Sequence, residues 1–366
     1  MESIVQYAWM ICKKQITHFV YKIKISYEYE KKFFIMAEMM KRIVAKGNMA
    51  NEIVEVEIPK INDNQILVKL SYMGVCMSEH YAWSTANEGQ RFGHEPMGVV
   101  VEVGKNITSV KVGDRVTGLM DGGMQEYIVT DVSRVFKVPD NITDVDAIGE
   151  PLACLVSAVS KVPLQYPGED SVAVVGCGYM GCGAIALLKA RGVGKLVAVD
   201  TNPESLKNAL KYGADEAYLP EELPENYLAV GNYWATGGFK YVMEWGETEA
   251  SLDTAIRMTR ALGFLGIGAY HTGGKRAVDV QMLNFKAIDM LSTHPRDTDR
   301  LMNSCRLAMD MLSSGLWNYK NVPTKVYPMD KFDEAHKDLE NKFGKYLKAV
   351  IDMNPEHIGA EPYIVE

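Results

Sequence analysis

The most informative segment of the chain runs from Asp170 to Asp200 and reads DSVAVVGCGYMGCGAIALLKARGVGKLVAVD. It consists of a short apolar run, a glycine-rich turn, a longer apolar stretch and a second apolar run. Such a pattern is typical of a buried strand, a helix and a second buried strand. Two buried strands joined through a helix form a βαβ unit, and these units build parallel sheets. The sequence therefore predicts an α/β region around a parallel sheet.

The glycines of this segment have the spacing G-x-G-x-x-G, directly after the first strand and at the start of the helix. The first glycine permits a tight turn, the second lets the backbone approach a pyrophosphate, and the third allows close helix–strand packing. The start of the helix adds unpaired N–H groups that attract phosphates. We therefore expect a dinucleotide to bind at Gly176, Gly178, Tyr179, Met180 and Gly181.

Asp200 ends the second predicted strand, 24 residues after Gly176 (200 − 176). A carboxylate at this place accepts hydrogen bonds from the ribose of NAD and repels the 2′-phosphate of NADP. The residues that follow, Thr201 to Pro203, provide no Arg or Lys for that phosphate. NAD is therefore favoured, and an NADP preference or a βαβ unit without a ligand are the weaker alternatives.

The chain has 366 residues, which suggests two domains. From Met39 to about Thr130, short β-rich runs alternate with turn residues, which is typical of a mostly antiparallel domain. After the nucleotide region, a helical stretch and a last apolar strand follow, so the nucleotide domain is expected to be inserted. The predicted division is an extension at 1–38, a β-rich domain at 39–158 and 296–366, and a dinucleotide domain at 159–295.

Composition narrows the function classes. The net charge of −8 argues against a nucleic-acid partner, because phosphates require a dense basic face. The cysteines number six and lack framework spacing, which favours a reducing cytoplasm over a disulfide scaffold.

The lysine-containing first 35 residues hold no apolar run near the ~20 residues of a membrane helix. We expect a poorly ordered extension there, with an amphipathic surface-binding arm as the alternative.

Four residues in three separate segments form a candidate metal site. Cys76 lies in GVCMSEH, His94 and Glu95 lie in GHEPMG, and Glu150 lies in EPLAC. Each alone is weak evidence, because a lone Cys is more often a small buried apolar residue and a lone His is usually structural. Together they provide the thiolate, imidazole and carboxylate ligands of a catalytic zinc that keeps one position open.

From about Met39 to Met353 the chain resembles the zinc-containing alcohol dehydrogenases of the medium-chain dehydrogenase/reductase superfamily. This resemblance implies a GroES-like, β-rich catalytic domain and a Rossmann cofactor domain. The EPL segment points to the polyol, sorbitol-like branch. The residues that carry the resemblance are Gly93, His94, Glu95, Gly98, Gly104, Ile107, GDRV at 113–116, GGMQEY at 122–127 and EPL at 150–152.

By this resemblance Cys76 and His94 are zinc ligands. Glu95 and Glu150 are the candidate third ligands, and either can bind directly or through water. Glu95 can instead hold one of the ligands in place without binding zinc itself. Cys154, one helical turn after Glu150, is a reserve ligand.

Relatives with a second, structural zinc hold it in a lobe rich in cysteine, whereas GDRVTGLMDGGMQEY contains none. One zinc per chain is therefore expected. Four further histidines match no ligand position and are expected to be structural or exposed: His271, His294, His336 and His357.

The resemblance also assigns a proton relay, which departs from the family pattern. Ser78 is the expected hydroxyl of the relay, and Ser78, Glu95 and Tyr81 are the predicted catalytic residues. Tyr81 stands where the family usually has His, so its hydroxyl, the neighbouring His80 or water is expected to pass the proton on. Glu79 replaces the usual Asp. The substrate pocket is expected near Tyr81, Trp83, Phe92 and the EPL segment.

The predicted activity is NAD-dependent oxidation of a secondary alcohol or polyol to a ketone, with a small-molecule substrate and no membrane partner. A threonine-type amino-alcohol dehydrogenase or an aldehyde reductase is the alternative within the superfamily. A zinc-free quinone or enone reductase and a non-catalytic NAD-binding protein are weaker alternatives, because the ligand residues are intact. The resemblance further implies a homodimer or homotetramer joined through the Rossmann domains.

Overall fold

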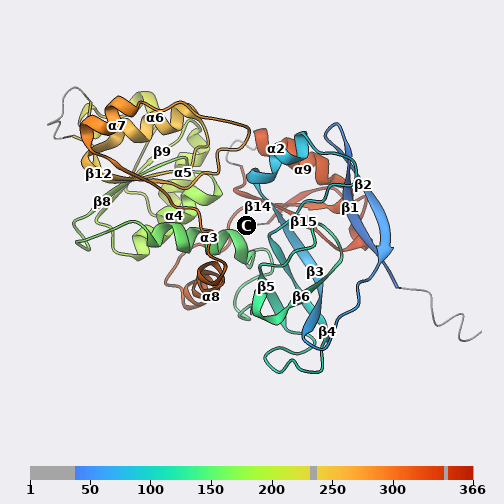
Figure 1. Ribbon diagram of the computed structural model, residues 1–366. Helices are drawn as coiled ribbons and strands as arrows, with labels where there is room; N and C mark the ends of the chain where they lie inside the picture. The colour runs from blue at the N-terminus through green and yellow to red at the C-terminus, as the bar shows by residue number, and fades with distance from the viewer. Residues whose placement is uncertain (1–37, 231–236, 342–344, 366) are drawn as a thin grey trace, which may run out of the picture. The chain divides into compact units, whose positions relative to one another are not determined.

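The computed structural model describes residues 38–230, 237–341 and 345–365. A six-stranded sheet, whose neighbouring strands all run parallel, follows the order β10-β9-β8-β11-β12-β13 (Figure 1). The predicted parallel sheet is therefore confirmed. Its strands are β8 (Ser171–Val175), β9 (Lys195–Val199), β10 (Glu216–Tyr218), β11 (Phe239–Glu244), β12 (Thr259–Ile267) and β13 (Asp289–Ser292).

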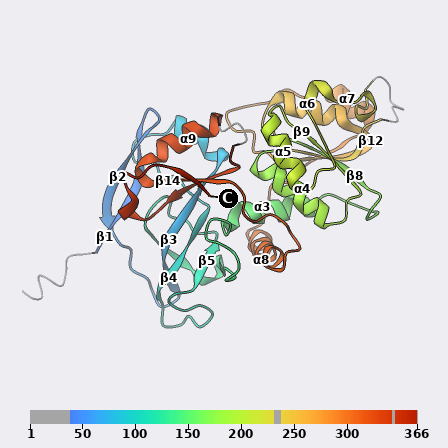
Figure 2. The same cartoon turned by 180° about the vertical axis from the view of Figure 1, so that it is seen from behind.

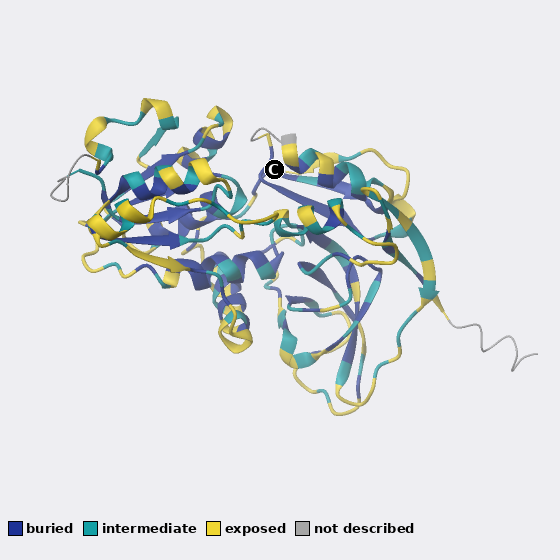
Figure 3. Cartoon of the chain, turned by 45° about the horizontal axis from the view of Figure 1, so that its top comes forward, coloured by how far each residue is buried: buried dark blue, intermediate teal, exposed yellow. Residues whose placement is uncertain are grey.

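Both faces of this sheet are covered, which explains why its central strands are apolar without alternation. Successive side chains of a strand point to opposite faces. Accordingly, Val172 and Val174 of β8 belong to one buried cluster, and Ala173 and Val175 belong to another. Figure 3 shows the central strands of this sheet as mostly buried. The helices of this region are α4 (Tyr179–Ala190), α5 (Pro203–Lys211), α6 (Glu249–Met258) and α7 (Val280–Lys286).

A second sheet follows the order β16-β14-β15-β3-β4-β5-β7, with β6 paired to β3. Its pairs are antiparallel apart from the parallel pair β14–β15, which confirms a mostly antiparallel region. Because β15 pairs with β3, the end of the chain returns to the sheet formed before the parallel one. The predicted division at 158 and 296 stays a prediction. The strands are β3 (Gln65–Val75), β4 (Pro96–Val103), β5 (Arg115–Gly118), β6 (Tyr127–Asp131), β7 (Val135–Lys137), β14 (Thr324–Pro328), β15 (Lys348–Asp352) and β16 (Tyr363–Val365).

Helices α3 (Gly149–Ser160) and α8 (Thr298–Ser314) lie side by side in both views (Figures 1 and 2). Leu155 of α3 and Leu312 of α8 belong to the same buried cluster as Val174 of the parallel sheet. The first turn of α3, which carries Glu150, is therefore anchored to a large apolar core.

The remaining elements are short. No helix within the described ranges is long and apolar enough to span a membrane. The extension predicted at 1–38 lies outside the described residues except for Glu38.

The remaining strands, helices and 3-10 turns are β1 (Met39–Gly47), β2 (Ala50–Glu57), α2 (His80–Ser84), α9 (Phe332–Asn341), η1 (Met77–Glu79), η2 (Val132–Arg134), η3 (Pro220–Glu222), η4 (Glu225–Tyr227), η5 (Met329–Lys331) and η6 (Pro355–His357).

His336 of α9 is fully buried and stacks on Trp83, with ring centroids 5.2 Å apart. Neither ring nitrogen of His336 has a hydrogen-bond partner among the described residues. Burial lowers the pKa of His336 to about 3; the charge of His80 adds to this shift and that of Asp333 opposes it. His336 is therefore a structural histidine that must stay neutral.

This burial predicts a loss of stability in acid. The unfolded chain takes up a proton on His336 below pH ~6.5, whereas the folded chain resists protonation until far lower pH, so stability falls as pH drops through this window. Between pH 7 and pH 4, the free energy of unfolding of the wild type is expected to fall by roughly 2 kcal/mol more than that of His336→Leu. Urea unfolding across this range measures the difference. Equal pH slopes for the two proteins would contradict the expectation.

Candidate active site

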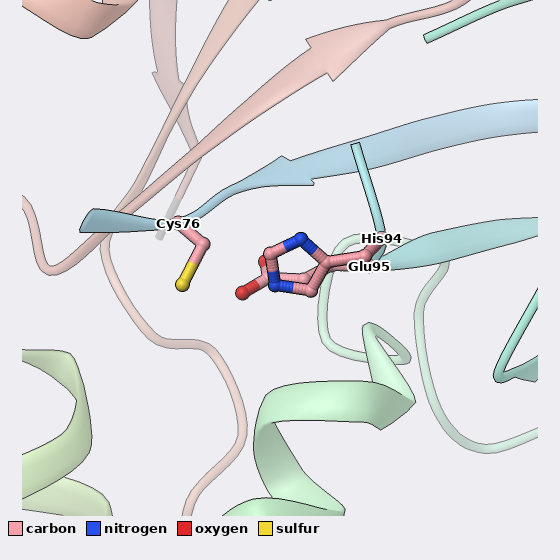
Figure 4. Close-up of side chains that lie close together, drawn as sticks. All are labelled: Cys76, His94 and Glu95. Carbon is pink, nitrogen blue, oxygen red and sulfur yellow. The ribbon is translucent and has the colours of Figure 1, made fainter. Parts of the chain in front are cut away.

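The candidate metal donors lie where β3 and β4 end beside each other. Cys76 follows β3, and His94 and Glu95 directly precede β4. These two strands are antiparallel neighbours, and the N–H of Gly74 donates to the carbonyl of Glu95 at 2.9 Å. As a result, one donor atom from each of Cys76, His94 and Glu95 lies within 4.8 Å of the others (Figure 4).

Close packing at this corner requires glycine at position 74. A methyl group built on Gly74 would lie 1.9 Å from Oε2 of Glu95, so any larger residue displaces that carboxylate. Glu95 is buried and forms an ion pair with Lys348 of β15. Lys348 also donates to the carbonyl of Val75 at 3.2 Å. The charge of Glu95 is therefore neutralised from the strand on the other side of β3.

Lys348 was not predicted from the sequence. The available signal was a lysine inside the otherwise apolar run YLKAVI, at a place where a charge needs a buried partner.

The His94 ring is oriented by Glu79, which closes the turn η1. Oε1 of Glu79 lies 3.1 Å from Nδ1 of His94 and also accepts the N–H of Gly93 at 2.8 Å. A carboxylate on one ring nitrogen fixes the tautomer and leaves the other nitrogen for a metal. Burial lowers the pKa of His94, but hydrogen bonds with Cys76 and Glu79 outweigh it and raise the pKa to about 12.

Glu150 lies in the first turn of α3, outside the group formed by Cys76, His94 and Glu95. Its Oε1 accepts the thiol of Cys154 at 3.2 Å. Burial and the negative charge of Glu95 raise the pKa of Glu150, and the charge of His94 opposes this. Glu150 therefore shares the electrostatic surroundings of the cluster, and Cys154 contacts Glu150 as a hydrogen-bond donor.

Ser78 adjoins the cluster, because its hydroxyl lies 3.1 Å from Sγ of Cys76. Tyr81 of α2 is half exposed. A methyl group built on Gly273 would lie 3.4 Å from Cδ2 of Tyr81, so the tyrosine ring borders the loop after β12. His80, the alternative relay residue, instead places Nε2 2.9 Å from Oε1 of Glu340.

Trp83 and Phe92 turn into the core and leave almost no surface for a substrate, so this part of the prediction is wrong. Trp83 is 2% exposed and Phe92 is 4% exposed, and both belong to the buried cluster of the second sheet. Nε1 of Trp83 donates to Asp333 of α9 at 3.0 Å. Aromatic residues close to the ligands in sequence serve here to anchor α2 and α9.

The glycine-rich turn has the geometry that the spacing predicts. Gly176 adopts a positive φ of 92°, and a methyl group on Gly181 would lie 1.8 Å from the carbonyl oxygen of Gly176. A methyl group on Gly178 would meet no atom within 4 Å. Open space therefore faces the turn at Gly178, while Gly181 maintains close backbone packing.

Side chains beside this turn tie it to the core and to β9. Oδ2 of Asp200 accepts the N–H of Cys177 at 2.6 Å, so the carboxylate lies against the turn. Tyr179 and Met180 are partly buried against the large apolar cluster. The carbonyl of Tyr179 accepts the hydroxyl of Tyr319 at 2.5 Å. These contacts hold the first turn of α4 in place.

Comparison with known proteins places these features in a family. Residues 62–140 match the alcohol dehydrogenase GroES-like domain, and residues 180–314 match the zinc-binding dehydrogenase domain. A probable D-xylulose reductase A of Neosartorya fischeri is 27% identical over 342 residues, which cover 80% of this chain and 91% of that protein. An L-threonine 3-dehydrogenase of Bacillus velezensis is 27% identical, covering 84% of this chain and 97% of that protein.

Solved structures share the fold. The crystal structure of 2R,3R-butanediol dehydrogenase from Bacillus subtilis superimposes with a TM-score of 0.70 at 23% identity, covering 86% of this chain and all (100%) of that chain. The chain belongs to the zinc-containing medium-chain dehydrogenase/reductase superfamily and is an oxidoreductase that acts on CH–OH donors. Zinc and a nicotinamide cofactor are typical of this superfamily.

Alanine at Gly181 and alanine at Gly178 are expected to have different effects. Gly181→Ala forces a backbone clash and is expected to lower the free energy of unfolding by about 1–3 kcal/mol. Gly178→Ala has room for its methyl group and is expected to keep the wild-type stability while weakening NADH binding, because the methyl group fills the space left for a pyrophosphate. Urea unfolding and NADH fluorescence titration separate the two effects. Unimpaired NADH binding by Gly178→Ala would argue against a cofactor at this turn.

Proposed function

We propose that this protein is a zinc-dependent, NAD-linked dehydrogenase that oxidises a secondary alcohol or polyol to a ketone. The observation that carries the proposal is the cluster of Cys76, His94 and Glu95, with a donor atom of each within 4.8 Å of the others. The hydroxyl of Ser78 adjoins this cluster. Such a site can bind a hydroxyl oxygen and remove its proton.

The donor set fits zinc. Thiolate, imidazole and carboxylate are the ligands of catalytic zinc sites, and Glu79 already orients His94 for this role. We assign Cys76 and His94 as ligands, with Glu95 or Glu150 as the third, bound directly or through water. When bound, zinc supplies Lewis-acid polarisation of the substrate oxygen. The place of Glu95 in the cluster supports Glu95 as the third ligand. Because its carboxylate already forms an ion pair with Lys348, Glu150 is the other candidate.

The proposed proton path begins at Ser78. Its hydroxyl would accept the proton of a bound alcohol and pass a proton on towards Tyr81 or water, while bound NAD would supply the hydride acceptor. His80 is less suited to this path, because its Nε2 faces Glu340. Tyr81 is therefore the proposed replacement for the usual relay histidine.

The glycine-rich turn fits the pyrophosphate of NAD. Gly178 faces open space at the start of α4, where backbone N–H groups and the helix dipole attract phosphates. Tyr179, Met180 and Gly181 complete the first turn of that helix. Asp200, at the end of β9, is positioned to accept the ribose hydroxyls, in exchange for its present bond to Cys177.

Two observations support a polyol substrate. The Glu150-Pro151-Leu152 segment resembles the polyol branch, and a probable D-xylulose reductase is among the relatives. Threonine is the second candidate, because an L-threonine 3-dehydrogenase has the same 27% identity.

A combined metal and substrate experiment tests the proposal. Wild-type protein is expected to contain one zinc per chain and to reduce NAD with polyols or secondary alcohols. Cys76→Ser is expected to lose zinc and at least 10²-fold in kcat/KM, since the Lewis acid is lost. Elemental analysis and NADH absorbance measure both, with Cys305→Ser as the matched control. Full turnover in metal-free protein would exclude the zinc mechanism, and threonine turning over far better than every polyol would replace the substrate.

We also propose a homodimer or homotetramer joined through the parallel sheets. Strand β13 ends the sheet, and its Met290 and Leu291 are 43% and 46% exposed. An exposed apolar edge strand is a template for pairing with another chain. Leu291→Lys is expected to reduce the mass measured by light scattering to that of one chain, and an unchanged oligomer would place the interface elsewhere.

Because Cys76 must keep its thiol to bind zinc, a reducing cytoplasm is the proposed location.

A further inference from the structure

A second group of polar and charged residues lies at the carboxyl edge of the parallel sheet, and none of its members is a proposed zinc ligand. Glu244 ends β11, the strand adjacent to β8, and pairs in register with Val175. A methyl group built on Gly176 would lie 2.6 Å from the backbone nitrogen of Gly246. The turn after β11 is therefore in direct backbone contact with the glycine-rich turn.

Glu244 is completely buried, yet both of its carboxylate oxygens have partners. Oε1 accepts the N–H groups of Gly246 at 2.7 Å and Glu247 at 3.0 Å, and the hydroxyl of Ser251 at 2.7 Å. Oε2 lies 2.9 Å from Nε2 of His271, which follows β12. Glu244 thus joins the turn after β11 to the loop after β12.

Glu247 makes a second connection between the same two segments. Its Oε1 accepts both the N–H of Thr272 at 3.0 Å and the hydroxyl of Thr272 at 2.9 Å. We name this arrangement the carboxylate clamp; it comprises Glu244, Glu247, His271 and Thr272. Two carboxylates hold two successive residues of one loop.

The clamp holds the backbone in an unfavourable conformation. Glu247 has φ 62° and His271 has φ 51°, in the left-handed region that residues other than glycine rarely adopt. Such strain persists only where surrounding contacts impose it, and it gathers at ligand sites. Both strained residues belong to the clamp, so its hydrogen bonds maintain a loop shape that the backbone alone disfavours.

The position of the clamp indicates its ligand. A doubly wound sheet binds a dinucleotide across the point where strand order reverses, with one mononucleotide on each side. Here the order reverses between β8 and β11, and Asp200 lies on the β9 side. The other mononucleotide therefore meets the ends of β11 and β12. The clamped loop also reaches Tyr81, since a methyl group on Gly273 would lie 3.4 Å from its ring.

We propose that the carboxylate clamp holds the His271–Gly274 loop as one wall of the subsite for the nicotinamide ribose, and that Glu244 and Glu247 are positioning residues for the cofactor. This inference rests on the proposed NAD cofactor. It assigns a function to four residues that are outside the glycine-rich turn and the metal site.

Glu247→Gly, Glu247→Gln and Thr272→Val test the clamp. Glu247→Gly relieves the left-handed strain but removes the acceptor for Thr272, whereas Glu247→Gln retains an acceptor oxygen. Leu262→Gly is the matched control, because Leu262 also has a positive φ of 57° but is 80% exposed and outside the clamp. NADH and AMP affinities are measured by fluorescence titration and calorimetry, because AMP lacks the nicotinamide ribose.

We expect Glu247→Gly to weaken NADH binding about tenfold while AMP affinity stays at the wild-type value, as for the loss of hydrogen bonds to a charged group. Glu247→Gln and Leu262→Gly are expected to stay within about twofold of the wild type for both ligands. Thr272→Val keeps the N–H but removes the hydroxyl, so a smaller loss of NADH affinity is expected. This variant tests the clamp even if Glu247→Gly does not fold.

Three results would overturn the clamp: unchanged NADH affinity in both Glu247→Gly and Thr272→Val, an equal loss of AMP affinity, or an equal loss of NADH affinity in Leu262→Gly. If the wild type itself binds AMP but no NADH, the proposed cofactor fails instead. The two failures are therefore distinguishable.

Discussion

Burial of the Glu95 carboxylate is the constraint on which the candidate site depends. A charge removed from water needs a partner of opposite charge, and Lys348 provides it from β15. Because β15 pairs with β3 and β3 pairs with β4, this ion pair joins three strands at the place where Cys76 and His94 emerge. Gly74 is required in the middle, since any side chain there would displace Glu95.

The same principle applies at the edge of the parallel sheet. Glu244 is buried without a lysine, and it is stabilised instead by three hydrogen-bond donors and His271. Both buried carboxylates therefore connect segments that are distant in the sequence. In each case the side chain that stabilises the charge also determines where a neighbouring loop or strand lies.

The sequence predicted the parallel sheet well because its signal is local. Apolar runs such as Val172–Val175, followed by a glycine-rich turn, need no information about distant partners. Strand pairing is different. The last helical stretch and apolar strand after the nucleotide region predicted that the chain returns to the first domain, but nothing in the sequence of β15 indicates that its partner is β3. The boundaries between domains are equally non-local and stay predictions.

The site was predicted in part, for a similar reason. Cys76, His94 and Glu95 were recognised by residue type and motif, and the structure brings them together. Their supports depend on side-chain direction, which the motif does not encode. Glu79 was recognised only as the replacement for a supporting Asp, without its contact to His94, and Lys348 was missed. The same limit explains the error at Trp83 and Phe92, whose rings turn into the core.

The pairing of β3 with β15 also has a consequence for synthesis on the ribosome. The bond from Lys348 to the carbonyl of Val75 joins residues 273 positions apart. A nascent chain that has emerged through the parallel sheet can form that sheet, because domains generally fold as units during synthesis. The neighbourhood of Cys76 is incomplete until β15 has left the exit tunnel. The donor cluster therefore gains its buried cation only after the 273 positions that separate Val75 from Lys348 have been synthesised.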